Sequence, residues 1–109
     1  PDTRGATAVP ASAALATGIY RDAWFGEVSL CPVGDQVQWR SVRSPRMLAT
    51  VKQLDGRLLL DWNQLGEDAW LQLDGKGRGA VMRLAAIDPD IDFSYDFQDL
   101  ELHWHAACR

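Results

Sequence analysis

The chain has few of the groups on which enzymes depend. Among its 109 residues there are only two histidines and two cysteines. No serine lies in the G-x-S-x-G or S-x-x-K patterns that carry a serine nucleophile. Cys31 falls in an expected strand, whereas a reactive thiolate is favoured at a helix N-terminus. The sequence therefore predicts no catalytic residue and no cofactor, and a domain that is not an enzyme by itself.

Two further absences argue against a membrane span and against nucleic acid as a partner. No run of about eighteen apolar residues is present, so no membrane span is expected. The net charge is −4 and the basic residues are scattered, which argues against nucleic acid because phosphate binding needs a basic patch. The basic residues that do lie close together, Arg40, Arg43 and Arg46, are predicted in a solvated loop. The sequence begins at Pro1 with no signal-peptide pattern, which suggests a piece of a longer protein.

The chain divides into a short tail and one domain. Residues 1–14 carry small side chains and two prolines, and they cannot bury enough surface to offset the entropy of ordering. We therefore predict a linker or disordered tail over 1–14 and a single domain over 15–109. From Gly18 onward apolar and polar residues alternate, and Asp55-Gly56 and Asp74-Gly75 are hairpin signals. The pattern predicts seven to nine short strands in an all-β antiparallel meander, either a barrel or a sandwich.

An aromatic stripe marks the last part of the chain. Phe93, Tyr95 and Phe97 share one face of an alternating segment, and the phase slips by one residue near Gln98-Asp99, as in a β-bulge. With Tyr20, these rings are predicted to form the barrel core. Burying each ring stabilises the fold by about 2–3 kcal/mol, so emptying this face would be costly. A ligand cavity lined by the same rings is the alternative reading.

Two arrangements resemble metal sites without completing one. His103 and His105 share a face with Glu101, but two imidazoles alone do not make a zinc site. Acidic residues also follow the spacing of a calcium loop, although Phe93 occupies the position where such a loop needs glycine; these residues are Asp88, Asp90, Asp92, Asp96 and Asp99. We predict no bound metal at either place.

Two other features bear on contacts and stability. Tryptophan is abundant, and some of these rings could mark a contact surface, because tryptophan is enriched at interface hot spots. Trp24 and Phe25 are the candidates, and Phe25 is favoured because it is out of phase with its apolar neighbours. Cys31 and Cys108 form either a disulfide, in an oxidising compartment, or two free thiols.

Three stretches together resemble a known family. They read GIYRDAWFGEV over 18–28, SPRM over 44–47 and DFSYDFQDL over 92–100. Over about residues 15–105 the chain is similar to the C-terminal domain of unknown function found on bacterial serine hydrolases related to class C β-lactamases and penicillin-binding proteins. Cys31 and Cys108 are not part of that pattern.

The resemblance implies a small lipocalin-like barrel behind a catalytic domain. The S-x-x-K serine and lysine would lie in that upstream domain of the same polypeptide, and no catalytic residue carries over to this chain. The implied role is to shape active-site access or to mediate assembly, self-association included. Such enzymes are often exported, so a periplasmic or exported location is favoured and with it the disulfide. The alternative function is a lipocalin-like barrel that binds a small apolar ligand.

Overall fold

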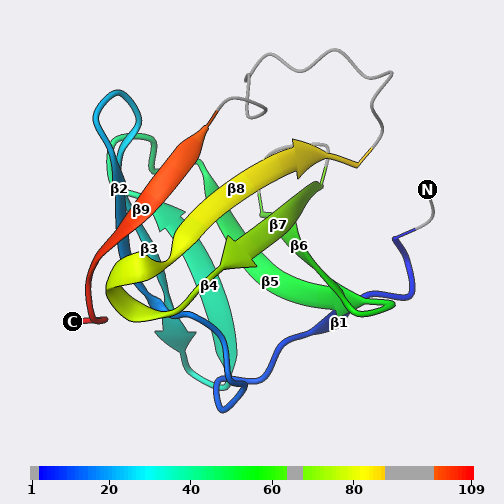
Figure 1. The fold of residues 1–109 in the computed structure, drawn as a ribbon. Helices are drawn as coiled ribbons and strands as arrows, with labels where there is room; N and C mark the ends of the chain where they lie inside the picture. The colour runs from blue at the N-terminus through cyan, green and yellow to red at the C-terminus, as the bar shows by residue number, and fades with distance from the viewer. Residues whose placement is uncertain (1–2, 64–67, 88–99) are drawn as a thin grey trace.

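The computed structural model describes residues 3–63, 68–87 and 100–109, which form an antiparallel β-barrel (Figure 1). The strands are β1 (Thr7–Ala8), β2 (Gly18–Asp22), β3 (Gly26–Val33), β4 (Gln36–Ser41), β5 (Leu48–Leu54), β6 (Arg57–Trp62), β7 (Ala69–Asp74), β8 (Val81–Ala86) and β9 (Glu101–Ala106). From β2 to β9 each strand pairs with the next along the chain, and β9 closes the barrel on β2. The all-β antiparallel meander barrel is thereby confirmed. No helix in the described residues is long and apolar enough to cross a membrane.

The hairpin turns follow from local sequence. Asp55 and Gly56 have φ angles of 51° and 80°, as expected where both central residues of a tight turn adopt the left-handed region. Gly34 joins β3 to β4 with a φ of 64°. The predicted hairpin at Asp74-Gly75 differs in detail, because a short 3-10 helix, η1 (Gly77–Gly79), separates β7 from β8. The strand that follows begins at Val81.

The barrel interior is filled by large side chains. Trp39 is fully buried, with its ring centroid 5.2 Å from that of Trp62 and 6.1 Å from that of Phe25. Its indole Nε1 donates to the sulfur of Met82 at 3.1 Å. Tyr20 is also buried, as predicted, and its hydroxyl donates to the carbonyl of Ala16. Burial raises the pKa of Tyr20 to about 12. The other predicted core rings, Phe93, Tyr95 and Phe97, lie outside the described residues.

The N-terminal segment contributes to the barrel within the range predicted as a linker or tail. Thr7 and Ala8 pair with β5 at Gln53 and Lys52, beyond the point where β4 stops pairing with that strand. Val9 is only 2% exposed and belongs to the core. β1 thus gives the backbone of β5 a partner where β4 has ended. Residues 7–10 are thus packed against the barrel although their composition predicts no structure.

The connections divide between two ends of the barrel. At one, here called the turn end, lie the β3–β4 and β5–β6 turns and η1, with residues 10–17 leading into β2. At the other, the loop end, lie the β2–β3 hairpin and residues 42–47. In Figure 1 the blue hairpin between β2 and β3 stands at the loop end, opposite the turn between β3 and β4.

Candidate functional site

Trp24 is the most prominent side chain of the loop end. It is 91% exposed, although it lies in a hairpin of only three residues between β2 and β3. One carboxylate oxygen of Asp22 accepts the backbone N–H groups of Trp24 and Phe25, at 2.9 and 2.7 Å. The guanidinium of Arg43 donates to the Trp24 carbonyl at 3.0 Å from the neighbouring loop. The backbone that carries the indole is therefore fixed from both sides.

Phe25 is not the exposed contact residue that the sequence predicts. Its side chain is half-buried and packs against the core, beside Trp39. The alternation argument treats Trp24 and Phe25 as neighbours along a strand, but residues 23–25 form the turn that reverses the chain. Outside a strand successive side chains do not alternate between faces. Of the two candidate contact residues, the structure exposes Trp24 alone.

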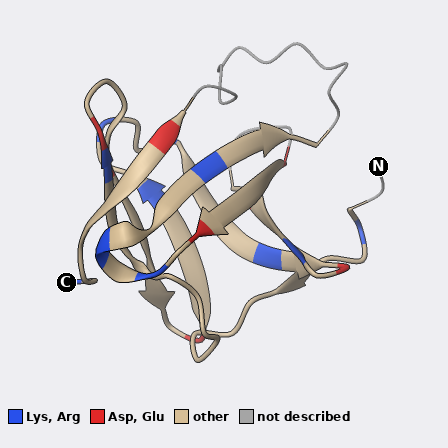
Figure 2. Ribbon diagram, in the orientation of Figure 1, with Lys and Arg blue, Asp and Glu red and all other residues tan. Residues whose placement is uncertain are grey.

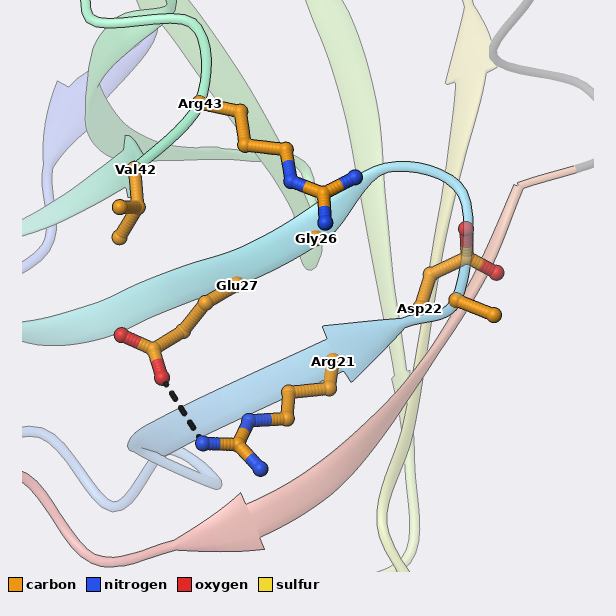
Figure 3. Close-up of a pocket in the computed structure, with 7 residues that line it drawn as sticks. Arg21, Asp22, Gly26, Glu27, Val42 and Arg43 are labelled. Atoms are coloured by element: carbon orange, nitrogen blue, oxygen red, sulfur yellow. Dashed lines mark hydrogen bonds and ion pairs between the residues drawn. The ribbon is translucent and has the colours of Figure 1, made fainter.

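A surface hollow of about 480 Å³ adjoins the hairpin (Figure 3). Its lining residues come from β2, β3 and the loop after β4, and they are Arg21, Asp22, Ala23, Gly26, Glu27, Val42 and Arg43. Gly26 has a φ of 91°, and a Cβ there would lie 2.8 Å from the Arg43 Cδ. The missing side chain lets Arg43 lie across the strand and reach the hairpin. Val42 adds an apolar surface that is 60% exposed.

Glu27 is the charged centre of this hollow. The Arg109 guanidinium donates to both of its carboxylate oxygens, at 3.1 and 3.2 Å, and Arg21 lies 3.4 Å away. The hydrogen bonds from Arg109, more than the charge and hydrogen bond of Arg21, hold the pKa of Glu27 below its ordinary value. Bidentate guanidinium–carboxylate pairs fix orientation as well as charge. The sequence offers no sign of this pair, because its members are 82 residues apart.

The C-terminal residues form a strap across the outer face of β3. Cys108 is joined to Cys31 by a disulfide that spans 77 residues of sequence, and Arg109 then reaches Glu27 further along the same strand. On β2 the side chain of Tyr20 faces the core, so that of its neighbour Ile19 points to the outside of the barrel. Ile19 is nevertheless only 3% exposed. Of the two states considered for the cysteines, the structure has the bonded one. The strap thus ties the turn end to the hollow at the loop end.

The histidines lie on the outer face of β9. His103 Nε2 is 3.2 Å from Glu101, whose carboxylate also pairs with Arg83 at 3.1 Å. His105 is exposed. Within the ranges that the structure describes, no group of three potential ligands stands close enough to hold a metal ion. The acidic run from Asp88 to Asp99 lies outside the described residues.

A second hollow, of about 320 Å³, lies beside Trp70 on β7. There the Arg57 guanidinium sits 3.7 Å above the centre of the indole ring. This tryptophan therefore has an intramolecular partner on its face, in a cation–π contact. Trp24 differs, since its backbone is held while its ring projects into solvent. The comparison singles out the loop end as the better candidate for binding another molecule.

Comparisons with protein-family models, with curated proteins and with solved structures found no match to this chain.

Proposed function

We propose that this chain is a non-catalytic accessory domain that binds the catalytic domain of a serine hydrolase related to class C β-lactamases, encoded upstream in the same polypeptide. Contact through the loop end would shape access to the active site of that enzyme. The choice of a serine hydrolase domain as the partner rests on the sequence resemblance. The observation that carries the proposal is Trp24, which is 91% exposed on a hairpin held by Asp22 and Arg43.

The energetics of Trp24 support a binding role. Burying a large apolar side chain is worth about 2–3 kcal/mol, and this chain forgoes that gain for Trp24. Because the hairpin backbone is already hydrogen-bonded, little entropy would be lost when a partner covers the ring. Tryptophan and arginine are also the residues most enriched at interface hot spots. An indole fixed in this way is suited to the centre of an interface.

The packing of the core disfavours the alternative of an internal apolar ligand. Trp39 sits in the barrel interior in contact with Phe25, Trp62 and Met82. A ligand in this place would have to displace the indole and break its bond to sulfur. A thermal-shift screen with apolar ligands checks this, because a ligand that binds the folded state raises the melting temperature with its concentration. A concentration-dependent rise would favour the ligand-binding function.

The disulfide supports a proposed location outside the cytoplasm. Disulfides persist in oxidising compartments and are rare in the cytosol. Cys31 and Cys108 are bonded, and the bond fixes the strap that carries Arg109. A periplasmic or exported location fits this chemistry and the proposed hydrolase partner.

The proposal is tested on the full gene. The reading frame upstream of residue 1 is expected to encode a domain with an S-x-x-K motif. That domain, expressed separately, should bind this chain in isothermal titration calorimetry, and Trp24→Ala should weaken the binding at least about tenfold, as truncated hot spots do. Val33→Ala is the matched control, because Val33 is an exposed apolar residue at the turn end. An upstream region without such a domain, or equal binding by Trp24→Ala and the parent chain, would refute the proposal.

Self-association is a distinct outcome of the same experiment. Sedimentation of the chain alone reports its oligomeric state. A dimer that Trp24→Ala dissociates would show that a second copy, and not the hydrolase domain, covers the loop end.

A further inference from the structure

The charge around Trp24 is opposite to that of the whole chain. The chain has a net charge of −4, yet exposed arginines lie on β2, on β4, in the loop of residues 42–47 that contacts the β2–β3 hairpin, and at the C-terminus; they are Arg21, Arg40, Arg43, Arg46 and Arg109. Figure 2 shows Lys and Arg positions over much of the barrel, including β2 and β4. Only Asp22 and Glu27 are acidic among the residues that line the hollow.

Both carboxylates at this surface are already engaged. Asp22 accepts two backbone N–H groups of the hairpin, and Glu27 accepts from Arg109 and Arg21. In the ranges that the structure describes, Arg40 and Arg46 form no ion pair, and both are exposed. Among the residues that the structure describes, the uncompensated charge of this surface is therefore positive.

The arginines have fixed positions relative to the apolar residues. Arg43 bonds to the Trp24 carbonyl through Nη1 while its stem lies on Gly26, which leaves its other N–H donors for a partner. Val42 is bonded through its backbone N–H to the Glu27 carbonyl, so its exposed side chain lies between the arginines of β2 and those of the loop. Figure 3 shows the Arg43 and Arg21 guanidinium groups on opposite sides of the hollow. The surface thus places the exposed apolar residues Trp24 and Val42 beside arginines.

We infer that this surface recognises an acidic protein face, with partner carboxylates that pair with Arg43, Arg46 and Arg40 around an apolar recess that receives Trp24. The inference rests on the proposed function and specifies the chemistry of the partner. Guanidinium groups pair with carboxylates through two parallel hydrogen bonds. A protein face fits better than a phosphate backbone, because the exposed side chains of Trp24 and Val42 need an apolar surface to cover them, which a phosphate backbone does not offer.

The inference can be tested on this chain without its partner. Poly-L-glutamate serves as the carboxylate probe, with binding measured by calorimetry at low salt. Arg46→Glu and Arg43→Glu are each expected to weaken binding about fivefold, because reversing a charge in contact with a polyanion adds repulsion. Arg46→Glu is the primary variant, since Arg43 also supports the hairpin. Arg78→Glu is the matched control; it changes net charge equally, but Arg78 lies in η1 at the turn end.

The other polyanions are outcomes of the same experiment. Tighter binding to polyphosphate or to phosphatidylglycerol vesicles than to poly-L-glutamate would overturn the inference. So would an Arg78→Glu effect as large as that of Arg46→Glu, because the response would then follow net charge and not this surface.

A second arm separates the inference from the proposed function. With the upstream domain as the partner, raising NaCl from about 50 to 300 mM is expected to weaken binding about tenfold, as screening predicts for exposed charge pairs. If Trp24→Ala weakens that complex while salt and Arg46→Glu do not, the proposed function stands and the acidic partner face is wrong. If neither Trp24→Ala nor Arg46→Glu has an effect, both proposals fail.

Discussion

The two ends of this barrel are built from different interactions. At the turn end the chain is held by tight hairpins, by the Cys31–Cys108 bond and by the segment before β2, where Trp104 Nε1 donates to the Thr17 carbonyl. At the loop end a three-residue hairpin holds an exposed tryptophan among arginines. The difference indicates that stability resides mainly at the turn end and that the loop end is available for recognition. Substitutions at the two ends should therefore have effects of different kinds.

Among the substitutions that compare the two ends, the largest expected effect is the loss of the disulfide. The double variant Cys31→Ser and Cys108→Ser removes a cross-link that spans 77 residues and constrains the unfolded chain. We expect the free energy of unfolding to fall by about 2–4 kcal/mol in guanidinium denaturation. The parent protein under reducing conditions is the control and should match the variant. Equal stability of the oxidised parent and the variant would place the stabilising contacts elsewhere.

A methyl group at Gly18 is expected to be nearly as damaging. A Cβ there would collide with the Trp104 indole nitrogen and lie 2.7 Å from the Ala106 carbonyl oxygen. Gly18→Ala should lower the free energy of unfolding by about 1–3 kcal/mol, because β9 or the indole must move. Gly79→Ala is the control at the same end, since nothing lies within 4 Å of its added Cβ. Similar losses in both variants would contradict the argument from close packing.

A smaller, pH-dependent effect is expected at Glu27. The lowered pKa means that the ionised group is favoured in the folded state, so its contribution is present above the ordinary pKa of 4.5 and is lost as pH falls through the lowered folded-state value. Glu27→Gln should therefore melt below the parent protein at neutral pH, and the gap should close on acidification. Thermal denaturation between neutral and strongly acidic pH measures the gap. A gap that stays constant with pH would mean that shape, and not charge, is responsible.

The smallest effect on stability is expected at Trp24. Trp24→Ala should change the free energy of unfolding by no more than about 0.5 kcal/mol, as exposed substitutions usually do. Trp39→Ala is the matched control, with an expected loss of about 3–5 kcal/mol from the cavity it leaves. A loss of several kcal/mol in Trp24→Ala would make that residue part of the fold and weaken the contrast between the two ends.

Local sequence signals predict much of the fold. Alternation fixes which faces of the strands are buried, so Ala80, Met82 and Leu84 are buried as their pattern indicates. Asp55-Gly56 identifies a hairpin because the required left-handed backbone is a property of two adjacent residues. These features depend on neighbours in sequence, and a single sequence contains that information.

The candidate site was predicted only in part, because it depends on contacts distant in sequence. Trp24 and Phe25 were both candidate contact residues, and Phe25 was favoured by extending strand alternation through a turn, whereas the structure exposes Trp24 and packs Phe25 against the core. The Arg109–Glu27 pair and the support of Arg43 for the hairpin bring together residues far apart in the chain. The composition of residues 7–10 also predicted no structure, because it shows neither their pairing with the edge of β5 nor the burial of Val9 in the core.

The short strand β1 has a consequence for behaviour at high concentration. A closed barrel avoids free strand edges, which otherwise recruit matching strands from other molecules. Here β4 stops pairing before β5 ends, and β1 covers the remaining length at Lys52 and Gln53. These two residue pairs cover the part of the β5 edge with which a strand of another copy could otherwise pair. Covering this edge is expected to reduce pairing between molecules at high concentration.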